Sequence, residues 1–181
     1  HRAGNEPGQC EPATDGRPVR PGRPLPTGAL SAPADLTFCK GDGLSLNASG
    51  GTTYAWYRNG VIDPLNTGAT INAKDEGTYT VEVISAAGCK AMASGSAILT
   101  QKAQPIPAFT VTPACAGSAT DFVNSSTYAG TGNLSFNWNL DDGFSANTTD
   151  ASQIYTKGGN KRITMTAVSS TCPNSPETAV A

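Results

Sequence analysis

The sequence has few charged residues, a single histidine and no long apolar run. Charged residues make up 14% of the 181 residues, and the formal net charge is −2. A chain so weakly charged offers no electrostatic attraction to nucleic acid or to an acidic membrane surface. No apolar stretch approaches the roughly 20 residues that a membrane-spanning helix needs, so we expect no membrane insertion. There is no signal peptide either, so a secreted chain of this sequence would be a processed or excised piece.

Catalytic chemistry is poorly supported. The only histidine is His1, which excludes a Ser-His-Asp or Cys-His arrangement within the rest of the chain. Paired carboxylates could hydrolyse a glycoside, but they need a cleft about 5–10 Å across. We therefore expect no enzyme and no cofactor.

The stretch from 51 to 83 carries the clearest strand pattern. Apolar and polar side chains alternate in two runs, GTTYAWYRNG and DEGTYTVEV, with the two-residue period of a β-strand. Asn59-Gly60 supplies the positive φ angles of a tight hairpin turn. Asp75-x-Gly77-x-Tyr79 has the form of a tyrosine corner, in which the phenol hydroxyl binds the backbone upstream. A tryptophan strand followed by a tyrosine-corner strand is typical of the centre of an immunoglobulin-like sandwich.

Five cysteines suit an oxidising compartment and lack the short spacing of a zinc site. They form two local pairs plus one residue left over. The sequence therefore predicts the disulfides Cys39–Cys89 and Cys115–Cys172, each stabilising its module by about 4 kcal/mol on the chain-entropy estimate. Cys89 follows Gly88 at an expected hairpin tip, so the first disulfide should clip an end or edge of its sandwich. Cys10 is expected to be unpaired: a free thiol, an intermolecular link or a residue whose partner has been lost.

Composition divides the chain into a tail and two modules. Residues 1–30 contain six prolines, five glycines and four of the six arginines, which favours an extended linker or tail; the alternative is a basic arm that docks on a partner. Residues 31–103 contain seven short strand patterns of a first sandwich. A proline-rich junction follows, and 106–181 show the pattern of a second sandwich that we expect to be truncated at its C-terminus.

Both modules resemble known families. CKGDGLSLNASGGTTYAWYRNG followed by DEGTYTVEVISAAGC resembles the Ig-like modules repeated in large secreted proteins of Bacteroidetes-type bacteria. VTPACAGSATDFVNSS, FNWNLDDG, IYTKGG and ITMTAVSSTC together resemble a polycystic-kidney-disease-type (PKD) domain. The second module departs from the W-D-F-G-D-G motif of that family at residues 139–141, and Ile163 stands where a tyrosine is usual. The resemblance implies an all-β fold of two tandem antiparallel sandwiches, with export and surface anchoring.

Aromatic and acidic side chains supply the remaining candidate sites. Trp56, Tyr79 and Trp138 are expected in the cores, because each lies mid-strand on the apolar face. Tyr57 faces the other way and is a weak candidate for stacking on a sugar ring. Three aspartates are a weak calcium candidate, and the alternative is a turn in which their carboxylates accept backbone N–H groups. These aspartates are Asp141, Asp142 and Asp150.

The leading functional hypothesis is a non-catalytic module of a large secreted or cell-surface bacterial protein. The two sandwiches would act as disulfide-clipped spacers or as contacts in an adhesive assembly. The expected partners are neighbouring domains of the same polypeptide or other surface proteins. The alternatives are a carbohydrate-binding accessory region of a polysaccharide-degrading enzyme and a docking subunit whose tail wraps a partner in a larger extracellular complex.

Overall fold

A computed structural model describes residues 10–11 and 23–181 of the chain. Within these residues the secondary structure consists of β-strands and turns, which confirms the all-β prediction. No helix in this part of the chain is long and apolar enough to cross a membrane. His1 and most of the expected tail lie outside the described residues.

The chain forms two compact units with an unexpected boundary. The first unit takes in the described residues up to Phe38 together with 42–101, and the second takes in Cys39–Gly41 together with Lys102–Ala181. The sequence pattern predicts a single module over all of 31–103. The three residues Cys39–Gly41, which we call the clasp, therefore interrupt the first unit and belong to the second.

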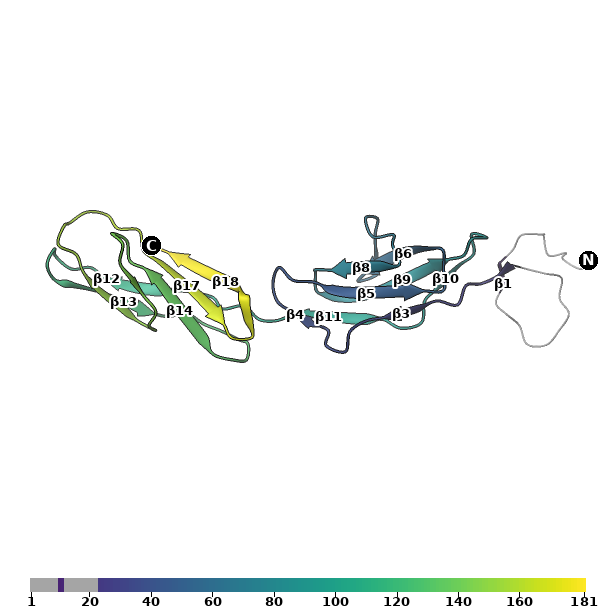
Figure 1. The fold of residues 1–181 in the computed structure, drawn as a ribbon, viewed down its shortest axis with the longest axis horizontal. Coiled ribbons are helices and arrows are strands. Elements are labelled where there is room, and N and C mark those ends of the chain that lie inside the picture. The colour runs from purple at the N-terminus through teal and green to yellow at the C-terminus, as the bar shows by residue number, and fades with distance from the viewer. Residues whose placement is uncertain (1–9, 12–22) are drawn as a thin grey trace, which may run out of the picture. The chain divides into compact units, whose positions relative to one another are not determined.

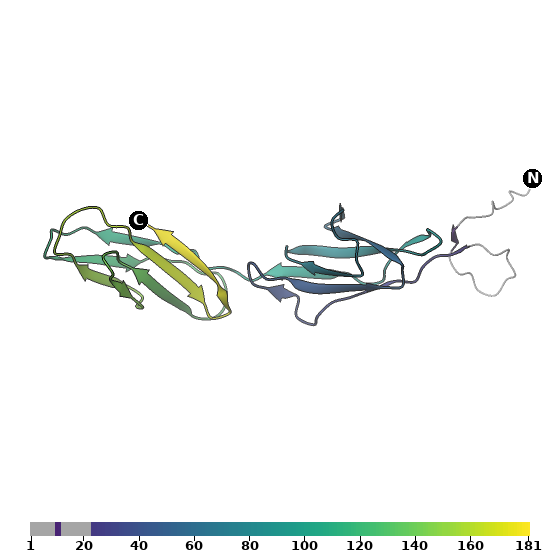
Figure 2. The same cartoon turned by 45° about the horizontal axis from the view of Figure 1, so that its top comes forward.

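Two sheets build the sandwich of the first unit (Figures 1 and 2). The larger sheet has the order β4-β11-β9-β6-β7, with β10 also paired to β9. The smaller sheet has the order β3-β5-β8. The strands of the larger sheet are β4 (Thr37–Phe38), β6 (Thr53–Arg58), β7 (Val61–Asp63), β9 (Gly77–Ile84), β10 (Lys90–Met92) and β11 (Ala97–Gln101). Those of the smaller sheet are β3 (Ala29–Ser31), β5 (Leu44–Ser49) and β8 (Thr70–Ala73).

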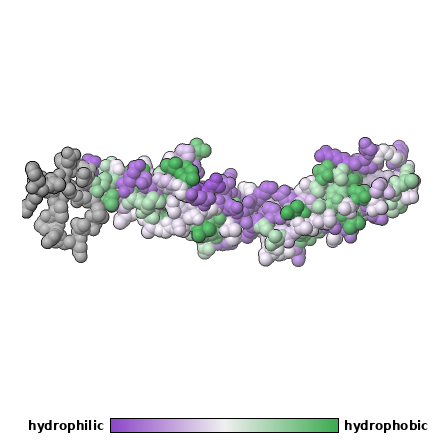
Figure 3. Space-filling model, turned by 180° about the vertical axis from the view of Figure 1, so that it is seen from behind, coloured by the Kyte–Doolittle hydropathy of each residue, from purple (hydrophilic) through white to green (hydrophobic). Residues whose placement is uncertain are grey.

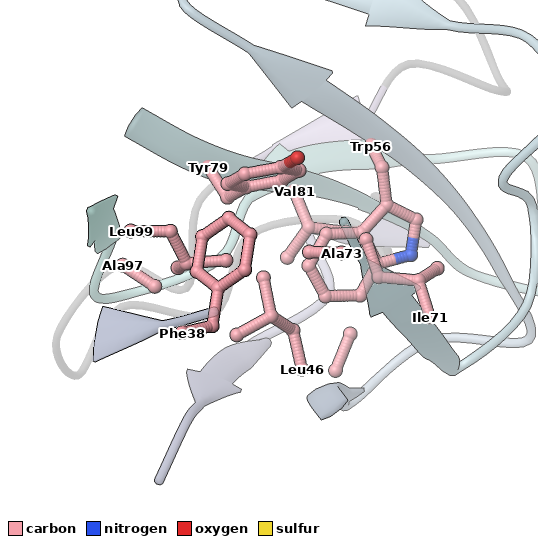
Figure 4. Packing of buried hydrophobic residues seen from close by; sticks show 10 residues of the cluster. Phe38, Leu46, Trp56, Ile71, Ala73, Tyr79, Val81, Ala97 and Leu99 are labelled. Carbon is pink, nitrogen blue, oxygen red and sulfur yellow. The ribbon is translucent and has the colours of Figure 1, made fainter. Parts of the chain in front are cut away.

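The core of the first unit lies between these two sheets (Figure 4). Trp56 of β6 is fully buried and sits in register with Val81 of β9. Leu46 of β5 packs into the same cluster from the smaller sheet. A fully buried large apolar side chain stabilises a fold by roughly 1.5–3 kcal/mol. The apolar faces of the alternating strands gain this energy when the two sheets pack face to face. The burial of Trp56 and Tyr79 confirms their expected place in the core.

The two turn predictions for this unit are confirmed. Asn59 and Gly60 have φ angles of 52° and 78°, and they join β6 to β7 in register from Arg58 to Val61. The Tyr79 hydroxyl donates to the backbone oxygen of Asp75 at 3.0 Å. The tyrosine corner therefore ties β9 to the turn that precedes it.

The second unit also has two sheets (Figure 1). One has the order β12-β13-β16 and the other β15-β14-β17-β18. The strands are β12 (Phe109–Thr112), β13 (Ala119–Asn124), β14 (Leu134–Asn139), β15 (Ser145–Ala146), β16 (Ala151–Ile154), β17 (Thr164–Ser169) and β18 (Cys172–Val180). The last strand, β18, has nine residues and is paired along β17.

Aromatic side chains fill the core of the second unit. Trp138 of β14 is buried, as expected, and its ring meets Phe109 edge to face with centroids 5.1 Å apart. Phe122 of β13 packs on the same indole at 6.1 Å. Edge-to-face aromatic pairs contribute about 0.5–1.5 kcal/mol beyond the area they bury. The two sheets of this unit are therefore joined through Trp138.

The described part of the expected tail is ordered against the first unit. β1 (Cys10–Glu11) pairs with β2 (Arg23–Pro24), and β3 pairs with β5. A side chain at Gly28 would collide with Val83, because an added Cβ would lie 2.5 Å from a methyl carbon of that valine. The prediction of a linker over all of 1–30 is therefore wrong for 23–30, whereas 1–9 and 12–22 lie outside the described residues.

Candidate functional site

A covalent attachment holds the clasp to the second unit. The chain leaves β4 at Phe38, and the next residue, Cys39, is disulfide-bonded to Cys172 at the start of β18, 133 residues further along the sequence. Cys172 is fully buried. By the chain-entropy estimate, a closed loop of this length stabilises the folded state by about 5 kcal/mol.

Polar contacts reinforce the same attachment. The Ser175 hydroxyl donates to the backbone oxygen of Lys40 at 2.7 Å, and Ser175 is buried. Lys40 Nζ lies 2.5 Å from Glu177 Oε1, with the lysine side chain 58% exposed. The hydrogen bond stabilises the contact by about 1 kcal/mol, and an ion pair this exposed adds at most about 1 kcal/mol. The disulfide therefore contributes most of the stability of this attachment.

The clasp changes how the two units are connected. The chain passes between them after Phe38, after Gly41 and after Gln101. A single linker near Pro105 would be the simple connection between tandem modules. Here the loop between β4 and β5 provides a second connection, and the disulfide closes it.

The predicted Cys39–Cys89 disulfide is wrong because its two residues lie at opposite ends of the first unit. Cys39 follows Phe38, which is in register with Gln101 beyond the Gly77 end of β9. Cys89 precedes Lys90, which is in register with Ile84 at the other end of β9. The eight residues of β9 span about 25 Å at the usual strand rise, whereas bridged cysteines need Cα atoms within about 7 Å.

The predicted Cys115–Cys172 disulfide fails for the same reason in the second unit. Cys115 lies near the Ile163–Ala181 backbone pair, at the start of β17. Cys172 is in register with Ser169 at the far end of that strand. The six residues of β17 separate them by about 20 Å. Cys115 is a free, exposed thiol, and all five cysteines are among the described residues.

Cys10, expected to be unpaired, is instead disulfide-bonded to Cys89. Cys89 is fully buried and is the last residue of the turn between β9 and β10. Arg23 donates from Nη1 to the backbone oxygen of Ala87 in the same turn, at 2.9 Å. The second disulfide therefore fixes the N-terminal segment to its own unit, and this segment is not a free arm at Cys10.

The two tryptophans are structural residues with the same hydrogen-bonding role. Trp56 Nε1 donates to the Gly68 backbone oxygen at 2.9 Å, and Trp138 Nε1 donates to that of Thr148 at 3.0 Å. In each unit the buried indole thus donates a hydrogen bond to the backbone of a neighbouring loop. Neither ring face is open to a sugar.

Tyr57 lies on the outer face of the larger sheet but does not form an open platform. It is half-buried, in register with Ile62 on one side and Thr80 on the other. Ile62 is 52% exposed, and side chains of residues directly opposite in an antiparallel pair lie on the same face with Cβ atoms about 5 Å apart. Stacking of a pyranose needs a free aromatic face, and neighbours on both sides limit the area that Tyr57 can offer.

The calcium candidate is not assembled as a cluster. Asp141 accepts the backbone N–H of Arg162 and of Asp142, both at 2.9 Å. These hydrogen bonds, that from Arg162 first, lower the pKa of the Asp141 carboxyl. Asp142 pairs with Lys161. Asp150 accepts the N–H of Asn124.

These contacts match the alternative that the sequence left open, in which the carboxylates bind backbone N–H groups of a turn. Asp141 and Asp142 have φ angles of 65° and 46°, a conformation that aspartate tolerates better than most residues. Among the described residues no group of three or more His, Cys, Asp or Glu is placed to hold a metal ion.

A hollow in the second unit was not predicted. It has a volume of about 380 Å³ and is bordered by Cys115, Phe122, Tyr155 and Lys161. Burial raises the pKa of Tyr155, and its hydroxyl donates to the Leu140 backbone oxygen at 2.5 Å. The hollow collects side chains from loops that are distant in sequence, so no local pattern indicates it.

Comparison with known proteins places both units. Residues 14–102 match the family "Ig-like domain CHU_C associated", and residues 102–180 match the family "PKD domain". Domains of these two families are typically non-catalytic modules. A comparison with curated proteins found no match.

Three solved structures show a distant likeness to the chain. The three N-terminal domains of the bacteriophage RB49 Highly Immunogenic Outer Capsid protein (Hoc) have 18% identity and a TM-score of 0.42 over 87% of this chain. This chain spans 58% of that phage chain. An amphioxus IgVJ-C2 molecule has 14% identity and a TM-score of 0.36, covering 80% of this chain and 97% of its own. The human OSCAR ligand-binding domain has 12% identity and a TM-score of 0.33, covering 87% and 99%. On the two family matches and the two-sheet architecture of each unit, the chain is an Ig-like domain of the CHU_C-associated family followed by a PKD domain.

Proposed function

We propose that the chain is a structural module of a larger secreted or cell-surface bacterial protein, in which the two domains form a disulfide-clipped spacer. The observation that carries this proposal is the clasp, in which Cys39 is disulfide-bonded to Cys172. A loop of the Ig-like domain is thereby made part of the PKD domain. Its partners are the neighbouring domains of the same polypeptide or other surface proteins.

The cysteine chemistry supports export. Disulfides persist in oxidising compartments and are rare in the reducing cytosol. Two of them lock this chain, and the cysteines at 89 and 172 are fully buried. In the reducing cytosol both disulfides would be reduced, and the clasp and the N-terminal attachment would lose their covalent bonds.

The surface favours a spacer over a carbohydrate-binding region. On the face shown in Figure 3, hydrophobic residues form separate patches among hydrophilic ones. Both tryptophans are buried, and Tyr57 is flanked by Ile62 and Thr80. Polysaccharide recognition on a sheet would use exposed aromatic rings, and these side chains do not supply them.

The location can be tested with the free thiol. A membrane-impermeant maleimide applied to intact cells of the source organism should label Cys115 of the parent protein, because this thiol is exposed. Cys10, Cys39, Cys89 and Cys172 should react only after reduction. Labelling of all five cysteines, and only after lysis, would overturn the proposal.

The alternative function has its own test. The purified chain is mixed with a panel of insoluble polysaccharides and a glycan array, beside the variants Tyr57→Ala and Thr80→Ala. The spacer proposal predicts no saturable binding. Saturable binding that is abolished by Tyr57→Ala and retained by Thr80→Ala would establish a carbohydrate site on the outer sheet face instead.

A further inference from the structure

The disulfide pattern decides which residues of the chain can carry tension. A pull applied to the two ends of a cross-linked chain stretches the shortest covalent route between them. From residue 1, the direct route to the clasp runs through Cys10 to Cys39, which are 29 residues apart. It then crosses the disulfide to Cys172 and continues to Ala181.

We propose that the Cys39–Cys172 disulfide, and not the connection from Gln101 to Lys102, transmits tension between the Ig-like and PKD domains. The route through Gln101 would require the chain from Cys89 to Cys172, which is 83 residues long. When the chain is fully stretched, the shorter route is taut and the longer connection through Gln101 remains slack. This inference rests on the proposed function, because a force route has a biological role only in a chain that acts as a spacer.

The two domains differ in which of their residues lie on the route that carries the force. Force enters the Ig-like domain at Cys10, which is anchored to Cys89 at one end of the domain, and leaves at Cys39 at the other end. The Cys10–Cys89 bridge itself is not on the route. In the PKD domain the route uses only the chain from Cys172 onward, which is β18. Strands β12 to β17, with the core around Trp138, lie inside the closed loop. Pulling can peel β18 away from β17, but it cannot extend the rest of the PKD domain.

The disulfide therefore limits how far the chain can stretch. At about 3.3–3.6 Å per residue, the 133 residues between Cys39 and Cys172 represent about 450 Å of extension that is withheld while the bridge is intact. The polar contacts of the clasp, from Ser175 and Glu177, hold the same site in the folded state. While the bridge is intact, a spacer built in this way cannot be stretched through strands β12 to β17.

Single-molecule force spectroscopy tests this route directly. The full chain, with handles after Ala181 and before His1 and with Cys115→Ser in every sample, is pulled until it is fully stretched. Addition of a reductant should lengthen the stretched chain by about 450 Å. The double variant Cys39→Ser/Cys172→Ser should be longer than the bridged chain by about 180 Å without reductant, because its route then crosses from Cys10 to Cys89.

The matched control is Cys10→Ser/Cys89→Ser, which leaves the shortest route unchanged and should stretch to the same length as the bridged chain. The stretched length depends on covalent bonds alone, so reduction of the unmodified bridges still tests the route if a variant folds poorly. A bridged chain that already reaches the reduced length would overturn the proposal. So would a Cys39→Ser/Cys172→Ser variant of unchanged length. Either result leaves the spacer proposal to the thiol-labelling test, so the two can fail separately.

Discussion

Tyr79, a buried residue of the Ig-like core, donates its hydroxyl to the backbone oxygen of Asp75 across 3.0 Å. Burial raises the pKa of this phenol, so the hydroxyl keeps its proton over the physiological range. The hydrogen bond fixes the turn before β9 to the central strand of the larger sheet. This hydrogen bond is the tyrosine corner that the sequence motif Asp75-x-Gly77-x-Tyr79 predicts.

Replacement of Tyr79 by Phe should lower the free energy of unfolding of the Ig-like domain by about 1 kcal/mol, because a partly buried hydrogen bond is lost while the ring remains. Tyr57→Phe is the matched control on the outer face and should change it by less than about 0.5 kcal/mol. Urea unfolding is followed by Trp56 fluorescence, with Trp138→Phe in both samples. Equal effects of the two variants would contradict the assigned role of Tyr79.

The Asp141 carboxyl should make the PKD domain sensitive to acid. Its pKa is lowered in the folded state by the N–H groups of Arg162 and Asp142. A lowered pKa stabilises the fold above the unfolded pKa, near about 3.9 for aspartate, and this stabilisation is lost as the pH falls through the folded value. Asp141→Asn should therefore lower the melting temperature of the PKD domain at pH 7, and the difference from the wild type should shrink below about pH 4. Parallel melting curves at all pH values would show that the ionised carboxylate has no such role.

Removal of each disulfide should destabilise a different domain. Cys39→Ser/Cys172→Ser should lower the stability of the PKD domain by about 2–5 kcal/mol, because Cys39 and the buried Cys172 both belong to the second unit. Cys10→Ser/Cys89→Ser should act on the Ig-like domain instead. Cys115→Ser should leave both unchanged, since this thiol is free and exposed. Calorimetry that resolves the two transitions measures each effect, and destabilisation of the PKD domain by Cys115→Ser would contradict the pairing.

Side-chain periodicity allowed the central strands to be predicted. Trp56 and Tyr79 each lie on an alternating run whose apolar face is buried, and the Asn59-Gly60 turn follows from residues that accept positive φ. These features are local, and a short stretch of sequence contains all the information. The same holds for Trp138 in the PKD domain.

The disulfides and β3 could not be predicted in this way. Nearness in sequence suggested partners for Cys39 and Cys115, but the strands place each cysteine at the opposite end of the sandwich from its expected partner. β3 is held to β5 by backbone pairing. The side chains of this proline-rich segment show no alternating pattern from which that pairing could be predicted. The hollow beside Cys115 depends on loops brought together only by the fold.

Disulfide mapping of the unreduced protein tests the clasp most directly. Free thiols are first blocked with N-ethylmaleimide, and digestion with trypsin and Asp-N then places the five cysteines on five different peptides. These peptides span 3–14, 35–40, 75–90, 103–120 and 163–181.

The structure predicts that peptide 35–40 is cross-linked to 163–181 and peptide 3–14 to 75–90, with the blocked thiol on 103–120. Cross-links of 35–40 to 75–90 and of 103–120 to 163–181 would contradict the clasp. They would show instead that each domain has its own internal disulfide, Cys39–Cys89 and Cys115–Cys172.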